Sequence, residues 1–213
     1  MSWVERAADR SPAVQRSRLR SSRQTLAIVA AAERLMAEKG GAFTTHEVAK
    51  EAGVALQTLY RHFDSKDHLL LAVFEDLLLR ASARYEDEDL DVDPLERLHV
   101  QFTASLDVPE RAGPGRRFLT SEYWRLYELF PDDMARATQP LVDSTERLLR
   151  ACIDAGVLHS DDPAGDAWLL TKMVMAIFHH RAFAPDDPPA QQAKERLWSF
   201  CLNALAPRVG PTT

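Results

Sequence analysis

Apolar side chains recur every three or four positions along nearly the whole chain, and no stretch alternates apolar and polar residues long enough to form a strand. This spacing is typical of amphipathic α-helices, so the pattern predicts an all-α protein with about nine helices. The expected helices span about residues 23–39, 45–51, 56–63, 65–84, 94–106, 116–129, 132–155, 163–183 and 189–205. Glycine and proline mark most of the connections, and Pro140 is expected to kink or split the seventh helix.

Residues 44–68 have the spacing of two short helices that meet at a tight turn. Val48 and Ala49 lie on the inner face of the first helix, and Gly53 supplies the backbone conformation that the turn needs. Leu59 and Phe63 are expected to pack the second helix onto the first. The opposite face of the second helix then displays mainly polar side chains, an arrangement that suits the major groove of DNA. The pattern therefore predicts a helix-turn-helix.

The charge distribution changes how the net charge is interpreted. The formal net charge of −6 argues, taken alone, against a nucleic-acid partner. Residues 1–62, however, hold ten Lys and Arg against six Asp and Glu, a net charge of +4, and residues 63–213 carry −10. Such asymmetry suggests that one end meets a polyanion while the other has a different task. The alternative is an accident of composition.

Composition excludes several classes of protein. The 213 residues are 46% hydrophobic and 27% charged, as in ordinary globular proteins. Cys152 and Cys201 are the only cysteines, which excludes a disulfide scaffold and a four-cysteine zinc site. The longest apolar runs stop near seven residues, and no hydrophobic segment of a secretory signal precedes Leu26. We therefore expect a soluble cytoplasmic protein with no membrane partner.

The helix-turn-helix carries a resemblance to a known family. The run from Gly53 to Asp67, Gly-Val-Ala-Leu-Gln-Thr-Leu-Tyr-Arg-His-Phe-Asp-Ser-Lys-Asp, follows Thr45-x-x-x-Ala49 and resembles the DNA-binding signature of TetR-family transcriptional regulators. The resemblance covers about residues 28–71 and extends to the total length and the number of helices. It implies a ligand-responsive repressor without a cofactor, which binds a palindromic operator in double-stranded DNA as a homodimer and is released by a small apolar or amphipathic effector.

The resemblance also implies a domain organisation. Residues 1–22 would form a basic N-terminal arm, 23–66 the helix-turn-helix domain, 67–207 the ligand-binding and dimerisation domain, and 208–213 a tail. Arg16, Arg18 and Arg20 of the arm are expected to lie along the DNA backbone or in a narrow minor groove. The alternative is a disordered tail that only aids solubility.

The DNA contacts implied by the resemblance fall into two groups. The phosphate contacts are Thr45, Tyr60, His62 and Lys66, and the base or groove contacts are His46, Leu56, Gln57, Thr58 and Arg61. Glutamine can bind adenine through two hydrogen bonds, and threonine can contact the methyl group of thymine. Leu56 stands where other members of the family often have a polar residue, so it makes a methyl contact or none. Tyr60 and His62 could instead serve in packing.

The C-terminal helices suggest a dimer interface and a ligand pocket. Helix 163–183 is apolar on nearly every side, which is explained by a core on one face and a second subunit on the other. The expected interface consists of Leu170, Val174, Ile177, Trp198, Cys201, Leu202 and Leu205. The expected pocket is lined by Phe102, Tyr123, Trp124, Tyr127, Trp168, Met173 and Phe178, although the residues alone are equally consistent with an ordinary core.

Two other functions are alternatives to a DNA-binding regulator. A metal site or hydrolase at His179 and His180 is disfavoured, because adjacent side chains on a helix point about 100° apart. No glycine-rich phosphate loop or nucleophile elbow is present, so we expect no enzyme activity. The remaining alternative is a helical ligand-binding or interaction protein whose helix-turn-helix is degenerate. Binding to DNA would distinguish it from a regulator.

Overall fold

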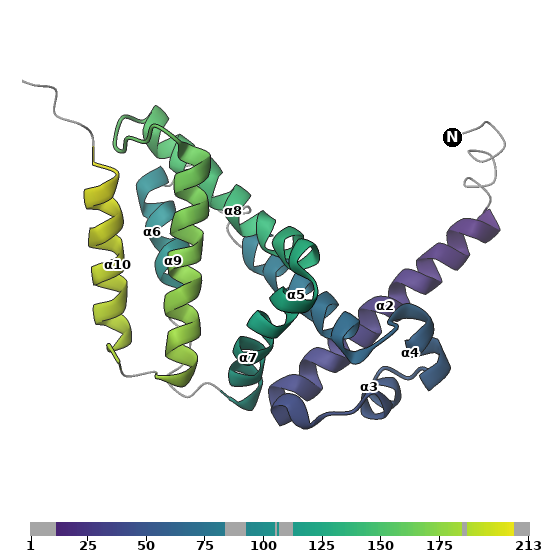
Figure 1. The fold of residues 1–213 in the computed structure, drawn as a ribbon. Helices are drawn as coiled ribbons and strands as arrows, with labels where there is room; N and C mark the ends of the chain where they lie inside the picture. Colours follow the sequence, from purple (N-terminus) through teal and green to yellow (C-terminus); the bar gives the residue numbers. More distant parts are fainter. Residues whose placement is uncertain (1–11, 84–92, 105, 107–112, 185–186, 207–213) are drawn as a thin grey trace, which may run out of the picture. The chain divides into compact units, whose positions relative to one another are not determined.

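The structure is a computed structural model that describes residues 12–83, 93–104, 106, 113–184 and 187–206, with side chains from Arg18 onward. Within these ranges the chain forms nine α-helices and one short 3₁₀ helix, and no strand (Figure 1). This confirms the prediction of an all-α protein. The chain divides into two compact units, Met1–Val73 and Phe74–Thr213, and the division falls inside helix α5 (Lys66–Ala83). The predicted tail 208–213 and residues 1–11 of the predicted arm lie outside the described residues.

The N-terminal unit is built on one long helix, α2 (Pro12–Lys39), which ends in the 3₁₀ helix η1 (Gly40–Ala42). Helix α3 (Thr45–Glu51) packs on α2, and α4 (Leu56–His62) packs on α3 (Figure 1). The core of this unit consists of apolar side chains that are almost fully buried: Ile28, Ala32, Met36, Phe43, Val48, Leu59, Phe63, Leu69 and Leu70.

The prediction that the first helix begins near Arg23 was wrong, because α2 begins at Pro12. No glycine or further proline interrupts residues 13–39. The intervening Arg, Gln, Leu and Ala residues are good helix formers, and proline suits the first position of a helix. The part of the predicted arm that the structure describes is therefore helical.

The helix-turn-helix is bounded by local signals. Thr44 caps α3 with a capping box, in which the Thr44 side chain accepts from the Glu47 backbone and the Glu47 side chain accepts from the Thr44 backbone. Gly53, between α3 and α4, has a φ of +66°, a left-handed conformation that strains residues with a Cβ. The structure confirms the predicted limits of α3, and α4 ends one residue before the predicted position.

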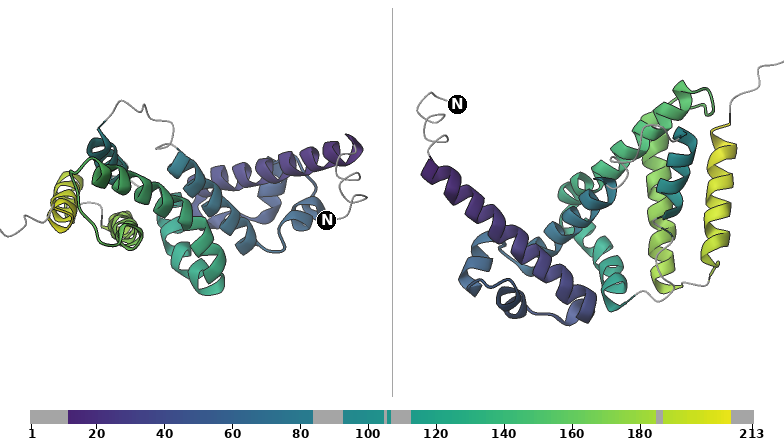
Figure 2. Two further views of the ribbon diagram at one scale, coloured as in Figure 1. Left: turned by 90° about the horizontal axis from the view of Figure 1, so that it is seen from above. Right: turned by 180° about the vertical axis from the view of Figure 1, so that it is seen from behind.

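The C-terminal unit contains five helices in addition to the second half of α5. They are α6 (Pro94–Ala104), α7 (Pro114–Leu129), α8 (Pro131–Asp154), α9 (Pro163–Phe183) and α10 (Ala190–Ala204). Helix α8 packs against α6, α7 and α9, while α10 packs against α6 and α9 (Figure 2). Its core consists of the buried residues Leu98, Phe102, Leu106, Leu148, Leu149, Cys152, Leu158, Leu170, Leu197, Cys201 and Leu205.

Helix α8 runs from Pro131 to Asp154 through Pro140 as a single helix, so the predicted split does not occur. A proline inside a helix removes one hydrogen bond and crowds the preceding turn. The buried face of α8 includes Met134, Ala137, Leu148 and Leu149, and this packing on both sides of Pro140 holds the helix together.

No helix in the described part of the chain is long and apolar enough to cross a membrane.

Candidate nucleic-acid interface and apolar cavity

Helix α4 has a buried face and an exposed face. Leu59 is fully buried and anchors the helix to the core of the N-terminal unit. Gln57, Tyr60 and Arg61 are exposed, while Leu56 and Thr58 are half-buried. The exposed face therefore presents an amide, a phenol and a guanidinium, which together can donate and accept hydrogen bonds at base edges and phosphates.

Two hydroxyl groups from different helices meet beside this face. The Thr45 Oγ1 atom, at the start of α3, lies 3.0 Å from the Tyr60 hydroxyl of α4. Tyr60 is 44% exposed, so the pair is accessible from solvent. His46, the next residue of α3, is exposed as well. The structure thus brings together two of the predicted phosphate contacts, and their hydroxyl groups can donate to a phosphate oxygen.

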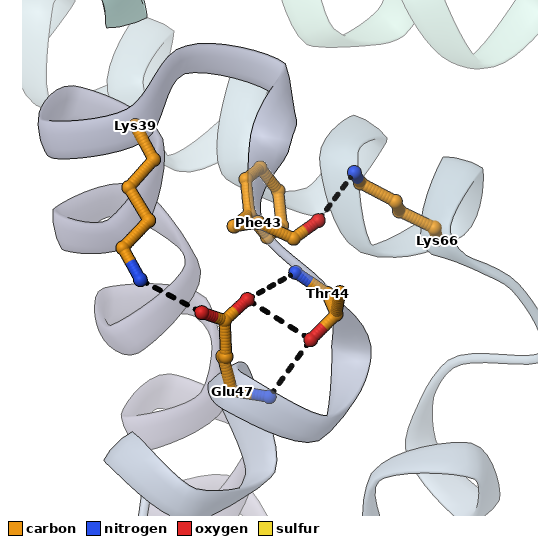
Figure 3. Close-up of polar contacts among 5 residues, drawn as sticks. All are labelled: Lys39, Phe43, Thr44, Glu47 and Lys66. Atoms are coloured by element: carbon orange, nitrogen blue, oxygen red, sulfur yellow. Dashed lines mark hydrogen bonds and ion pairs between the residues drawn. The ribbon is translucent and has the colours of Figure 1, made fainter.

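Lys66 binds the segment that leads into α3. Its Nζ atom donates to the backbone oxygen of Phe43 at 2.8 Å (Figure 3). It also donates to the backbone oxygen of Gly41 at 3.1 Å, and it lies 4.0 Å from the centre of the Phe43 ring. These contacts hold a positive charge beside the entry to α3. Lys66 therefore combines a structural role with the charge that a phosphate contact needs.

The start of α3 is fixed by a second charged network. Glu47 accepts from the Lys39 ammonium at 2.7 Å and from the Thr44 backbone at 2.8 Å (Figure 3). The Lys39 contact and the two Thr44 hydrogen bonds lower the pKa of Glu47 to about 2. The carboxylate is therefore charged at neutral pH and keeps the first turn of α3 in a fixed position.

His62 points toward the inside of the motif. Its Nδ1 atom lies 3.2 Å from Thr25 Oγ1 of α2, and its Nε2 atom is buried with no hydrogen-bond partner in the described structure. The ring also lies near Phe63, with centroids 6.5 Å apart. This placement favours a packing role for His62 over a phosphate contact.

The arginines of the predicted arm lie on the first turns of α2. Arg18 and Arg20 are exposed, and Arg16 lies on the same helix. Leu19 and Leu26 are also exposed, at 59% and 61%. A contact of these arginines with DNA would therefore be made from a helix and not from an extended strand of chain.

The C-terminal unit encloses an apolar cavity of about 310 Å³, with walls from the second half of α5 and from α6, α7, α8 and α9. Of the predicted pocket residues, Phe102, Tyr123 and Phe178 line it. Tyr127 and Met173 do not, and Trp124 and Trp168 are 63% and 54% exposed. The cavity thus collects fewer of the aromatic residues than the sequence suggested.

Sequence reasoning missed the polar side chains of the cavity, which are Gln101, Arg116, Thr120, Thr145, Thr171 and His179. Arg116 and Thr120 are four residues apart on α7 and therefore share a face. A search for polar residues on the inner faces of the predicted helices could have found this pair. Burial, followed by the charges of Arg116 and Lys172, lowers the pKa of His179 to about 4, so its ring is neutral at pH 7.

The residues of the predicted dimer interface face mainly inward. Leu170, Cys201 and Leu205 belong to the core, and Val174 lines the cavity. Ile177, Trp198 and Leu202 are half-buried against the same core, and Ile177 also lines a groove on the surface of α9. The large exposed apolar residues of α9 and α10 are instead Trp168, Leu169, Phe183 and Phe200. Sequence reasoning missed Leu169 and Phe200, each of which directly precedes a core residue and points away from the core.

The two last helices lie side by side (Figures 1 and 2). Their side chains leave a groove between them. Its lining includes Met173, Ala176 and Ile177 of α9 and Leu197 and Phe200 of α10. An exposed apolar groove of this kind is typical of a surface that contacts another protein. We call this groove, together with the exposed residues Trp168, Leu169, Phe183 and Phe200, the α9–α10 face.

Comparison with known proteins shows that the N-terminal unit is similar to a known family of regulatory proteins. Residues 28–73 match the sequence profile of the family described as "Bacterial regulatory proteins, tetR family". The chain is 37% identical over 78 residues to the HTH-type transcriptional repressor KstR2 of Mycobacterium tuberculosis, which is 36% of this chain and 39% of the repressor. It is 32% identical over 113 residues to the nucleoid occlusion factor SlmA of Vibrio atlanticus, which covers 51% of this chain and 56% of that protein. The chain thus matches only about half, or less, of these relatives.

Similar folds extend over most of the chain. A TetR transcription regulator of Haloarcula marismortui aligns with 87% of this chain and 100% of its own, with a TM-score of 0.67 and 21% identity. RolR, crystallised in complex with resorcinol, aligns with 88% of this chain and 89% of its own, with a TM-score of 0.66 and 17% identity. At these identities the similarity establishes the fold.

Proposed function

We propose that this chain, which belongs to the TetR family of bacterial regulatory proteins, is a repressor that binds a palindromic operator as a homodimer and leaves it when a small amphipathic molecule fills the cavity. The observation that carries the proposal is the exposed face of α4, held on a buried Leu59 behind a left-handed Gly53. A short helix presented in this way fits the major groove.

Each contact in the proposal has a defined chemical role. Gln57 and Arg61 reach base edges, where glutamine suits adenine and arginine suits guanine. Tyr60 and Thr45 contact a phosphate through their paired hydroxyl groups, and Lys66 adds a positive charge. His46, Leu56 and Thr58 contribute to the groove contact, with a methyl contact from Leu56. His62 acts as a packing residue against Thr25.

The α9–α10 face supports a homodimer. Phe200 is 60% exposed and Leu169 is 50% exposed, and burial of such side chains against a second copy favours association. A closed dimer places the same face of both subunits in contact across a twofold axis. Two reading helices related by that axis require a palindromic operator with half-sites about one helical turn apart.

The cavity supports a small-molecule effector. Its volume of about 310 Å³ lies at the lower end of the range of small-molecule pockets. RolR, which has a similar fold, was crystallised with the small phenol resorcinol. An effector changes the affinity for DNA only if it binds the DNA-free form more tightly than the DNA-bound form.

The test is fluorescence anisotropy of the full chain with labelled DNA from upstream of its own gene, at moderate salt, with a scrambled duplex as the control. We expect tighter binding to the upstream DNA. Gln57→Ala should cost about 1–3 kcal/mol at particular base pairs. Gln139→Ala, on the exposed surface of α8, makes the same change outside the interface and should have no effect.

The alternative is an interaction protein whose helix-turn-helix is degenerate. It would bind both duplexes equally weakly, and Gln57→Ala would then change nothing. Equal binding of the two duplexes would therefore overturn the proposed function. If the upstream DNA is preferred but Gln57→Ala leaves that preference intact, the assignment of Gln57 is wrong and the reading face must be sought elsewhere on α4.

A further inference from the structure

The cavity of the C-terminal unit contains two sets of polar side chains that differ in one respect. In the first set, Gln101 donates to Thr145 at 2.8 Å and accepts from Ser144 at 3.2 Å, and Thr171 donates to Ala167 O at 2.8 Å. The Thr171 hydroxyl also lies 3.2 Å from that of Thr145, so these groups satisfy one another across α6, α8 and α9. They need no ligand.

The second set contains four polar atoms that lack a hydrogen bond. The Nε and Nη2 atoms of Arg116, the Oγ1 atom of Thr120 and the Nδ1 atom of His179 are all buried, and none has a hydrogen bond in the described structure. All three residues line the cavity. A buried polar group without a hydrogen bond is costly, and a charged one is more so, which makes such a cluster unusual in a folded protein.

The unpaired cluster is also positively charged. No Asp or Glu is among the residues that line the cavity, and no ion pair joins Arg116 to the described part of the chain. The guanidinium of Arg116 lies 4.5 Å from the centre of the Phe178 ring. Burial, followed by the nearby charge of Arg181, lowers the pKa of Arg116. An anion in the cavity would offset both effects.

The unpaired atoms also specify the shape of that anion. The Nε and Nη2 atoms of an arginine lie on one edge of the planar guanidinium, and their N–H groups point in parallel. This edge matches the two oxygens of a carboxylate. The Thr120 hydroxyl and the neutral His179 ring can each supply a further hydrogen bond. The rest of the wall, including Leu77, Leu119 and Phe102, is apolar.

We propose that the cavity binds an amphipathic carboxylate, whose acid group pairs with Arg116, Thr120 and His179 and whose hydrocarbon part lies against the apolar wall. The inference deepens the proposed function, and it rests on that function only for the effect of the ligand on DNA binding. It narrows the effector from any small amphipathic molecule to an acid.

Calorimetric titration of the full chain, without DNA, tests the inference. The probes are decanoate, its neutral analogue decanamide and the cation decylamine. We expect decanoate to bind at least tenfold more tightly than decanamide, and decylamine to bind least. Failure of decanoate to bind, or equal affinities for the acid and the amide, would overturn the inference.

Arg116→Gln should remove the preference for the acid, with a loss of at least tenfold for decanoate and less than threefold for decanamide. Arg117→Gln is the matched control, because it removes the same charge from the next position of α7, is exposed and does not line the cavity. It should leave both affinities within twofold. A preference that persists in Arg116→Gln would count against the site.

Thermal unfolding checks that the Arg116→Gln variant is still folded. Without ligand, Arg116→Gln should melt at the same temperature as the parent or higher, because it removes an unpaired buried charge. Decanoate should raise the melting temperature of the parent but not that of Arg116→Gln. If Arg116→Gln unfolds, Thr120→Val takes its place, with a smaller loss for decanoate and none for decanamide.

The experiments distinguish failure of the proposed function from failure of the carboxylate site. If the protein binds decanoate but does not distinguish its upstream DNA from a scrambled duplex, the proposed function fails and the carboxylate site stands. If the DNA is bound specifically and decanoate is not bound, the carboxylate site fails and the proposed function stands. If both bind, decanoate should weaken DNA binding by the parent and not by Arg116→Gln.

Discussion

Beside the helix-turn-helix, Lys66, Glu47 and the hydroxyl pair of Thr45 and Tyr60 have partners within the chain, whereas in the cavity of the C-terminal unit several polar atoms have none. Lys66 is bound by two backbone oxygens, and Glu47 is bound by an ammonium and by a capping interaction. By contrast, Arg116, Thr120 and His179 each have at least one buried polar atom without a hydrogen bond.

The contrast follows from where each ligand would bind. DNA meets an exposed surface, where water satisfies the polar groups until the phosphates replace it, so internal partners can fix these side chains beforehand at little cost. A cavity excludes most of the water, and its polar groups depend on the ligand for their hydrogen bonds. Unpaired polar atoms therefore indicate a ligand site in a cavity, while an exposed site is recognised by its geometry and charge.

The substitution with the largest expected effect tests whether the two units are independent of each other. Leu59→Ala removes a fully buried side chain from the core of the N-terminal unit and should destabilise that unit by about 2–5 kcal/mol. Hydrogen exchange of the α3 and α4 amides should accelerate accordingly, and DNA binding should be lost. Binding of decanoate to the C-terminal unit should be unchanged.

Loss of ligand binding in the same variant would show that the two units fold as one and would remove the basis for treating them separately. Leu129→Ala provides the control, since this residue is 50% exposed at the end of α7. A substitution there should change the free energy of unfolding by less than about 0.5 kcal/mol.

Lys66→Met tests whether the internal contacts of the interface matter for DNA binding. It keeps an unbranched side chain but removes two hydrogen bonds and the positive charge. We expect DNA affinity to fall about tenfold for every sequence, with a salt dependence reduced by about 0.9 in logarithmic slope. Binding titrations at several salt concentrations measure both. A loss confined to one sequence would assign Lys66 to base recognition.

Much of the N-terminal unit was predictable because its signals are local. The limits of α3 follow from the Thr44 cap and from Gly53, both of which act within a few residues. The start of α2 is not predicted correctly, because the serines and arginines before residue 23 are typical of a basic N-terminal arm. Their composition is equally compatible with a helix, and no breaker separates them from the residues that follow.

The C-terminal unit shows where sequence patterns stop being informative. The hydrophobic pattern predicts the positions of α9 and α10 along the chain. It does not determine which of their apolar side chains face the core of the C-terminal unit, because α9 is apolar on nearly every side. Cys201 faces inward and its neighbour Phe200 outward, and only the packing of α10 on α6 and α9 decides this. The cavity depends on side chains from five helices, so no local pattern reveals that the buried Nε and Nη2 atoms of Arg116 lack hydrogen bonds.

Thr44→Ala has a smaller expected effect, confined to the start of α3. It removes the side chain of the capping box and should cost about 1 kcal/mol. Amide exchange in the first turn of α3 should report the change, and DNA affinity should fall by less than in Lys66→Met. Thr44→Ser keeps the hydroxyl and should preserve most of the stability. Equal destabilisation by both substitutions would mean that the cap is not the cause.

The smallest expected effect concerns two groups whose pKa values are both lowered, for opposite reasons. Partners favour the charged form of Glu47, and burial disfavours the charged form of His179. The stability contributed by Glu47 is present above its ordinary pKa of about 4.5 and is lost as the pH falls toward 2. For His179 the unfolded chain binds the proton more readily, so stability declines as the pH falls from about 6.5 toward 4.

The two pH ranges barely overlap, so urea unfolding at pH 7 and pH 5 isolates His179. Because the ring is partly exposed, the parent should lose only about 0.5–1 kcal/mol more than His179→Gln between these pH values. His180→Gln changes the adjacent, exposed histidine and should behave like the parent. If His179→Gln shows the same loss as the parent, His179 is not kept neutral by burial. The carboxylate site would then have to present a charged ring, and its preference for an acid over an amide should weaken as the pH rises.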